Sequence, residues 1–217
     1  MTIKQLLTTT ILLLSSAAQG QTDFEETKLL AEQGDAIAQS NLGYMYYGGR
    51  GVPQSYIEAI TWYRLAAEQG FAHAQFNLGV MYANGVGVPE NDAEAVIWYR
   101  LAAEQGFAHA QFNLGVMYAN GVGVPENDAE AVIWYRLAAE QGYAYAQNNL
   151  GLMYFNGAGA PQDDVRAYMW WSVSTAQGYV EARTNRDIAA DRLTPAQTTQ
   201  GQYMATKCFE SDYQDCE

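Results

Sequence analysis

The chain has 217 residues, 49% of them hydrophobic and 13% aromatic, and its formal net charge is −13. This composition predicts a folded chain rather than a disordered one. The acidic excess argues against nucleic acid or an anionic lipid surface as a partner, because binding to either needs clustered Lys and Arg. It favours a neutral or basic partner instead.

Residues 1–20 have the pattern of a secretory signal peptide. Lys4 supplies a positive charge, an apolar stretch follows it, and the small residues Ala18 and Gly20 stand at positions −3 and −1 of a cleavage site. We predict a mature chain that begins at Gln21, a periplasmic or secreted location, and no membrane insertion after cleavage. The alternative is an uncleaved anchor, which the stretch disfavours because it is shorter than the roughly 20 residues that span a bilayer.

A first helix is predicted over residues 22–33, where Asp23 and Glu26 have the spacing of a capping box. Its tail, residues 30–34, recurs almost unchanged at residues 66–70. The mature chain is therefore expected to open with the second half of a repeat, which would cap the array.

A short loop with two glycines and a proline recurs four times at a spacing of 36 residues. Glycine permits the positive φ angles of a tight reversal, and proline suits the entry to a new helix. A loop of this kind at a fixed period predicts a solenoid, in which each unit buries its apolar face on the next. The four copies are Gly49–Pro53, Gly85–Pro89, Gly121–Pro125 and Gly157–Pro161.

Each unit is expected to hold two helices. In the second unit, apolar residues at a spacing of three and four predict helix A over residues 72–84 and helix B over residues 91–105, and Gly106 predicts a left-handed C-cap. Residues 62–106 and 98–142 are identical. This identity indicates that the array grew by duplication and that the copies have similar neighbours.

The repeat pattern decays after Gly178. The segment Thr194, Pro195 and Gln197 then predicts an N-cap, a proline at the first helical position and a glutamine that completes a capping box. The last helix is expected to run to about Lys207. The whole chain is therefore predicted to be all-α, with eleven helices and no strands.

Three parts are predicted along the chain: a signal peptide over 1–20, a repeat solenoid over 21–207 and a tail over 208–217. The tail holds the only two cysteines, Cys208 and Cys216. An even count in an exported chain predicts one disulfide that pins the last helix, and free thiols are the alternative.

No catalytic signature is found in the sequence, which has no Ser-x-x-Lys, His-Glu-x-x-His or Gly-x-Ser-x-Gly motif. His73 and His109 occupy the same repeat position without nearby Cys or carboxylate ligands, which makes a poor metal site. The carboxylates recur at the repeat period, as a solvated face does. We predict no enzyme activity, no metal and no cofactor.

One repeat pattern carries a resemblance that covers roughly residues 24–192. Its residues resemble the Sel1-like repeat family, relatives of the tetratricopeptide repeats. The resemblance implies a right-handed α-solenoid of about five 36-residue helix-turn-helix repeats with capping helices. In the second unit the pattern comprises Ala74, Leu78, Gly79, Met81, Tyr82, Gly85, Gly87, Pro89, Ala95, Trp98, Tyr99, Ala102, Ala103 and Gly106.

The resemblance also implies a function. Sel1-like proteins are mostly adaptors and scaffolds, so the chain is expected to bind a protein or peptide through the concave face of its A helices. Two alternatives stay open by the same analogy. One is hydrolysis of a β-lactam or a cell-wall peptide, as in a cysteine-rich branch of the family. The other is a structural part of a bacterial envelope machine.

An asparagine recurs just before the Leu-Gly pair of each A helix. In tetratricopeptide domains, which this pattern resembles, the equivalent position often contacts the backbone of a bound peptide, and an amide offers a donor and an acceptor together. The alternative is a structural bond to a neighbouring helix. This asparagine ladder comprises Asn41, Asn77, Asn113, Asn149 and Asn185.

The same helical register places a wider set of apolar, aromatic and amide side chains toward the concave side, and this mixture resembles a peptide groove. The set contains no Lys or Arg, which argues against a clamp for a carboxylate. It comprises Tyr44, Tyr47, His73, Phe76, Val80, Asn84, His109, Phe112, Val116, Asn120, Tyr145, Asn148, Leu152, Phe155 and Asn156.

Overall fold

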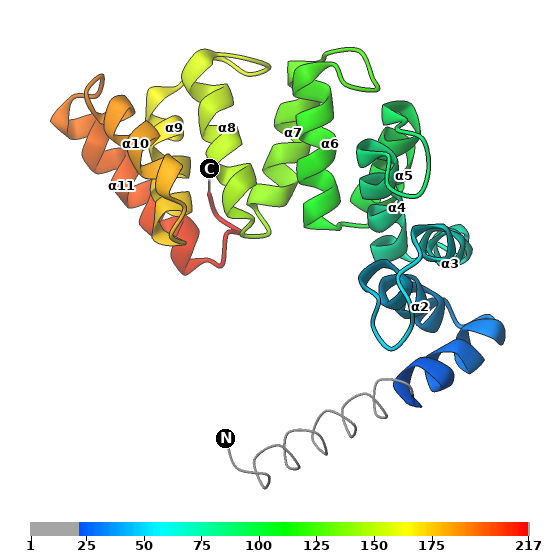
Figure 1. Cartoon of the computed structure of the whole chain (residues 1–217). Helices are drawn as coiled ribbons and strands as arrows, with labels where there is room; N and C mark the ends of the chain where they lie inside the picture. Colours follow the sequence, from blue (N-terminus) through cyan, green and yellow to red (C-terminus); the bar gives the residue numbers. More distant parts are fainter. Residues whose placement is uncertain (1–21, 217) are drawn as a thin grey trace, which may run out of the picture. The chain divides into compact units, whose positions relative to one another are not determined.

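The computed structural model describes residues 22–216, which divide into two compact units, residues 22–91 and residues 92–216 (Figure 1). The predicted signal peptide lies outside the described residues. Helices connected by short loops make up both units, and residues 22–216 contain no strand. This confirms the expected all-α solenoid of repeats of about 36 residues.

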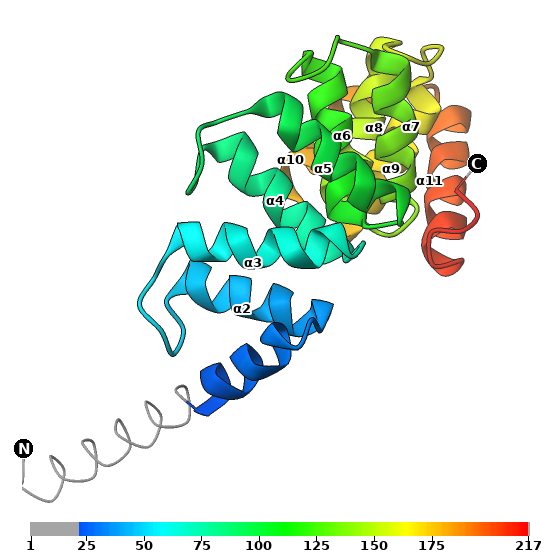
Figure 2. The ribbon, with the colours of Figure 1, turned by 90° about the vertical axis from the view of Figure 1, so that its right-hand side faces the viewer.

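The first unit begins with helical residues 22–32 and continues through three labelled helices (Figure 2). Phe24, Ala31, Ala38 and Leu42 form a buried core at its start. The labelled helices are α2 (Ala36–Gly48), α3 (Tyr56–Glu68) and α4 (Ala72–Asn84).

The second unit continues the alternation and ends with one extra helix. We call α2, α4, α6, α8 and α10 the A helices, and α3, α5, α7 and α9 the B helices. The helices of the second unit are α5 (Asp92–Glu104), α6 (Ala108–Asn120), α7 (Asp128–Ala139), α8 (Ala144–Asn156), α9 (Asp164–Ala176), α10 (Val180–Ala190) and α11 (Pro195–Glu210).

The loop glycines do what the sequence predicts at the helix ends. Gly85 closes α4 in the left-handed conformation, with φ 63°. The second glycine of the loop, Gly87, is required for a different reason. A Cβ on Gly87 would lie 2.8 Å from Cβ and 2.9 Å from the carbonyl oxygen of Tyr56, at the start of α3. Only glycine therefore lets this loop rest on the preceding B helix.

Buried glutamines join successive helices, a feature that the sequence analysis did not identify. Gln147 on α8 is fully buried, and its Nε2 donates to the carbonyl oxygen of Ala139 at the end of α7 at 3.1 Å. Its Oε1 accepts from Gln177, just past α9, at 2.6 Å. Gln111 makes the corresponding pair of bonds. Each buried amide is thus satisfied, as a buried polar group must be.

The B helices α3, α5 and α7 also bind the next A helix through an arginine. Arg100 on α5 donates to the hydroxyl of Tyr118 on α6 at 2.6 Å, and Arg136 on α7 donates to Tyr154 on α8 at the same distance. Arg64 and Tyr82 repeat the bond within the first unit.

The end of the chain confirms two predictions. Thr194 and Gln197 form the capping box at the start of α11, which runs to Glu210, slightly beyond the expected end. Cys208 and Cys216 form the disulfide, and their Cα atoms lie 4.3 Å apart. The bridge joins α11 to the tail that follows it.

Candidate functional site

In the first unit, two hollows of about 400 and 310 Å³ lie along the A helices and meet at Tyr44 and Asn77. Tyr44 is exposed, and Asn77 is half-buried. The structure therefore brings together seven of the predicted residues. The first hollow is lined by Ser40, Asn41, Tyr44, Phe71, His73 and Asn77, and the second by Tyr44, Tyr47, Tyr63, Phe76, Asn77, Val80 and Met81.

In the second unit, the predicted side chains His109, Phe112 and Tyr145 belong to a band of touching rings. Tyr143 connects them, with ring centroids 4.8 Å from His109 and 5.2 Å from Phe112. Tyr145 is 50% exposed and continues the band to Tyr179 at 4.8 Å. We call this set the aromatic band; it comprises Phe107, His109, Phe112, Tyr143, Tyr145 and Tyr179.

The sequence analysis missed the rings that precede the A helices. Phe107, Tyr143 and Tyr179 occupy the N-cap positions of α6, α8 and α10, where none makes a side-chain capping bond. The first A helix instead has Asp35, whose carboxylate accepts from the backbone N–H of Ala38 at 2.7 Å. Polar caps stabilise helix starts by about 1 kcal/mol relative to apolar residues. An aromatic residue directly after Gly106, Gly142 and Gly178 was the available signal.

The asparagine ladder has a structural bond in the second unit. The amide of Asn113 donates to the hydroxyl of Tyr99, and the amide of Asn149 donates to that of Tyr135. Tyr135 also packs against Gly115, where a Cβ would lie 2.7 Å from its ring. An amide N–H of each asparagine is thus engaged, and the Oδ1 of Asn149 also accepts from Nδ2 of Asn148 at 3.2 Å. Both asparagines are half-buried and so reach the surface.

Other predicted amides lie elsewhere. Asn148 is buried; its Nδ2 donates to Asn149, and its Oδ1 accepts from Asn185 on α10. Asn84 and Asn120 each donate to a backbone carbonyl of their own helix at 2.7 Å. The predicted positions Val116, Leu152 and Asn156 lie on α6 and α8, where Val116 is half-buried and the other two are exposed.

Two guanidinium groups lie over predicted rings, although the predicted set holds no cation. Arg50 lies over Tyr44, with its central carbon 4.5 Å from the ring centroid. Arg192 lies over Phe155 at 3.8 Å. Cation–π contacts of this kind place a positive charge at the edge of the A-helix surface. Sequence spacing could not reveal them, because Arg50 belongs to a loop and Arg192 to the decayed last repeat.

The tyrosines under the A helices are held neutral. Burial raises the pKa of Tyr99 to about 12, partly offset by the bond from Asn113, and Asp92 raises it further. Burial likewise raises the pKa of Tyr63 and of Tyr135. These phenols are hydrogen-bonding groups at neutral pH, and they bring no charge to the surface.

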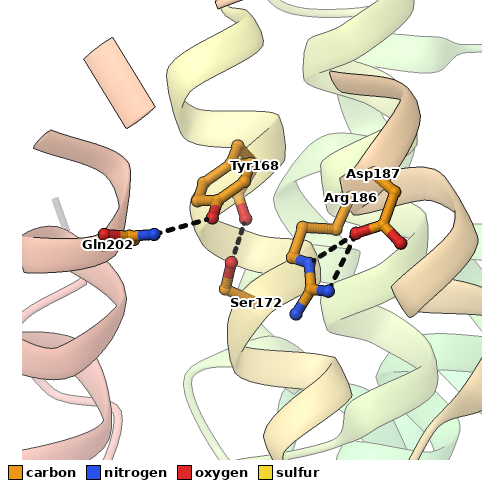
Figure 3. Close-up of polar contacts among 5 residues, drawn as sticks. All are labelled: Tyr168, Ser172, Arg186, Asp187 and Gln202. Carbon is orange, nitrogen blue, oxygen red and sulfur yellow. Dashed lines mark hydrogen bonds and ion pairs between the residues drawn. The ribbon is translucent and has the colours of Figure 1, made fainter. Parts of the chain in front are cut away.

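A further hollow, of about 580 Å³, lies between α9, α10 and α11. Figure 3 shows its polar side chains: Gln202 donates to the hydroxyl of Tyr168, Ser172 donates to the backbone of Tyr168, and Arg186 pairs with Asp187 at 2.8 Å. Arg186 stands where the full repeats carry a buried leucine, such as Leu150. The core position has become half-buried and charged.

Residues 22–216 contain no group of three or more His, Cys, Asp or Glu side chains that could hold a metal ion. In the same part of the chain, none of the helices combines the length and apolar character needed to cross a bilayer.

The model of the Sel1 repeat matches four consecutive segments of the chain, residues 36–71, 72–107, 108–143 and 144–179. These segments begin at the A helices and follow the period read from the loops. No curated protein matches the chain.

Two solved structures are similar over most of the chain. One is c5321, described as a protective antigen of uropathogenic Escherichia coli with an SLR fold; it is 40% identical, with a TM-score of 0.72, over 86% of this chain and 44% of that one. This chain therefore spans less than half of that protein. The other is a Sel1 repeat protein from Oxalobacter formigenes, 35% identical, with a TM-score of 0.71, over 88% of this chain and 82% of that one.

Proposed function

We propose that this chain, which belongs to the Sel1 repeat family, binds an extended segment of a partner protein along its A helices and catalyses no reaction. Sel1 repeats commonly mediate protein interactions. The proposal goes further than the family by assigning the surface and the kind of ligand.

The observation that carries the proposal is the pair of hollows in the first unit. Both border Tyr44 and Asn77, so an exposed ring and an amide lie side by side between two concave sites. A concave apolar surface with a few placed polar groups is the usual form of a binding site. An amide can pair with both the N–H and the C=O of a peptide, because it donates and accepts.

The second unit supports the same reading with a different surface. Three rings of the aromatic band stand at the N-cap positions of α6, α8 and α10, which therefore have no side-chain capping bond. Tyr145 of the same band is half exposed. Exposed tyrosine provides large contact area at a low cost in conformational entropy. Asn113, which follows Phe112 of this band directly in the chain, is half-buried and brings an amide to the same surface. A peptide with apolar side chains and free backbone N–H groups would find both partners there.

The partner is proposed to be neutral or basic, since the chain is strongly acidic. We also propose that the chain is exported to the periplasm or beyond. The disulfide between Cys208 and Cys216 supports a non-reducing compartment.

Site-specific crosslinking tests the proposal. A photo-reactive phenylalanine analogue placed at Tyr44 or Tyr145 in the native host should link the chain to one partner, and mass spectrometry should map the linked peptide. Tyr203 on α11 is 68% exposed and serves as the matched control. The mapped peptide, made synthetically, is then titrated against purified mature chain.

The expected result is loss of at least about tenfold in affinity for Tyr44→Ala or Asn77→Ala, because anchors in a binding pocket carry most of the interface energy. Tyr203→Ala should leave affinity unchanged. A partner that links only through Tyr203, or a peptide that binds both groove variants as tightly as the parent chain, would overturn the proposal.

A further inference from the structure

The last B helix shows how this fold accepts an additional helix. α11 packs on α9, and the buried Gly201 lies at the crossing point. A Cβ there would lie 2.7 Å from the Tyr168 ring and 3.4 Å from the carbonyl oxygen of Val165. Gln202 adds a hydrogen bond to the Tyr168 hydroxyl at 3.3 Å (Figure 3). A small residue therefore lets one helix approach the outer side of another closely.

The same positions two repeats earlier are uncovered. Met169 and Val173 on α9 are 0% and 1% exposed. Their counterparts on α5, Ile97 and Leu101, are 52% and 39% exposed. Neither belongs to the residues that α5 buries, which include Val96 and Tyr99.

A hollow of about 500 Å³ marks this side of α5. We call the residues of α5 that line this hollow the outer face of α5. They are Ala93, Val96, Ile97, Arg100, Leu101 and Glu104. The loop 123–125 forms the rim. Tyr168, Ser172, Val173 and Ala176, which line the hollow beneath α11, occupy the positions of Val96, Arg100, Leu101 and Glu104.

The interface made by α11 already extends toward this face. After α11 the tail reaches the end of α7, where Gln214 donates to the carbonyl oxygen of Glu140 at 3.4 Å. The ring of Tyr213 also lies against Gly142, since a Cβ there would be 2.7 Å from it. The chain thus covers α9 and touches the end of α7, and α5 carries the same surface two repeats from α9.

Two differences between α9 and α5 determine which helix could pack on α5. Where α9 has Ser172 and Ala176, α5 has Arg100 and Glu104. Arg100 is engaged, because it donates to the Tyr118 hydroxyl at 2.6 Å. Glu104 is exposed. A helix on this face would therefore meet an apolar strip and a negative charge at its end.

We infer that the outer face of α5 is a second docking site, for an amphipathic helix of a partner protein that has a small residue at the crossing point and a basic side chain opposite Glu104. This site is separate from the A-helix surface, so the two proposals stand or fail independently.

The probe is a fluorescently labelled peptide of residues 194–210, the helix that binds the equivalent face, with the change Glu210→Lys. Glu210 lines the same hollow as Ala176, the counterpart of Glu104. Anisotropy should show saturable binding to the mature chain. Leu101→Asp should weaken it by at least about tenfold, as expected for a central apolar contact. Leu137→Asp, at the identical position on α7, should change it by less than about twofold, as for residues outside the contact.

A charge swap makes the test specific. Glu104→Lys should reverse the preference, so that the peptide with its native Glu210 binds better than the Lys peptide by about threefold to fivefold, the range of an exposed ion pair. A probe with Gly201→Leu should lose binding. Circular dichroism should report unchanged helicity for Leu101→Asp, and Leu101→Asn provides a milder second variant.

Several results would overturn the inference. One is no saturable binding of the Lys probe. Another is equal binding to the Leu101→Asp, Leu101→Asn and parent chains, which would mean that the probe displaces α11 from α9. A third is greater sensitivity to Leu137→Asp than to Leu101→Asp.

Discussion

α7 and α9 are consecutive B helices in the same register, yet one is covered and the other is not. α7 leaves Ile133 and Leu137 51% and 40% exposed, whereas α9 buries Met169 and Val173 almost completely. The repeat register is the same in both helices. What differs is the neighbour, because α11 lies on α9. Burial in this fold is therefore set by what covers a position as much as by its place in the repeat.

The sequence of α9 differs from that of α7 at positions that α11 covers. Arg136 and Glu140 of the preceding repeat become Ser172 and Ala176, which removes two charges from a surface that is shielded from water. Tyr135 becomes Trp171, which is 1% exposed and donates from Nε1 to the carbonyl oxygen of Asn148 at 2.9 Å. The loss of the arginine and the glutamate is what the cost of burying unpaired charge leads one to expect.

The largest expected effect tests this comparison directly. Val173→Asp should lower the free energy of unfolding by at least about 3 kcal/mol, because it buries an unpaired carboxylate. Leu137→Asp, at the same repeat position, should cost under about 1 kcal/mol, as at an exposed site. Urea titrations followed by circular dichroism measure both. Equal losses would show that α11 does not shield α9.

Removal of the disulfide should have the next largest effect. Cys208→Ser with Cys216→Ser should destabilise the chain by about 2–3 kcal/mol, as expected for a short closed loop. The loss should be local to the part of the molecule that α11 covers, since coupling in a solenoid is mainly between neighbours. Hydrogen exchange should rise in α11 while α5–α8 keep their protection. Uniform loss of protection would contradict this.

A smaller effect extends the comparison to the A helices. Asn113 donates to Tyr99, whereas its counterpart Asn185 donates to Asn148, because Trp171 has replaced the tyrosine. Asn113→Ala should cost about 1 kcal/mol of stability through the lost bond. Thermal unfolding provides the measurement. Asn120→Ala is the control, since Asn120 bonds only its own helix, and a loss as large as that of Asn113→Ala would contradict the structural role.

The smallest effect is confined to alkaline pH. The folded pKa of Tyr99 is raised to about 12, above its usual value near 10. Its stabilising contribution is therefore complete below pH 10 and is lost as pH rises through about 12. The Tm should fall over this range, and Tyr99→Phe should make the fall shallower. A Tm profile identical to that of the parent chain would contradict the assignment.

Much of the fold follows from local sequence. The bounds of α4 were predicted as residues 72–84 and are Ala72–Asn84. Helix starts and ends depend on nearby residues, such as Thr194 and Gln197 at α11. The disulfide prediction followed from the even cysteine count and the predicted export of the chain. These signals act over a few residues, so they can be read from one sequence.

Other features depend on contacts across repeats and could not be read in that way. Glutamine is usually exposed, but Gln147 lies in the core, where two partners outside its own helix satisfy its amide. Trp98 is half-buried, whereas Trp170, at the same repeat position, is 1% exposed. The packing of α11 on α9 involves the C-terminal part of the chain, where the repeat pattern is lost and periodicity no longer guides the prediction.

The loop glycines also bear on how the array can change in length. Gly87 rests on the backbone of Tyr56, and Gly123 and Gly159 rest in the same way on Asp92 and Asp128. At these loops, main chain thus packs closely against main chain in the same way from one repeat to the next. The number of repeats can therefore change by itself, because recombination between identical segments can add or remove one whole repeat. The bonds between the remaining repeats would then form again at the same spacing.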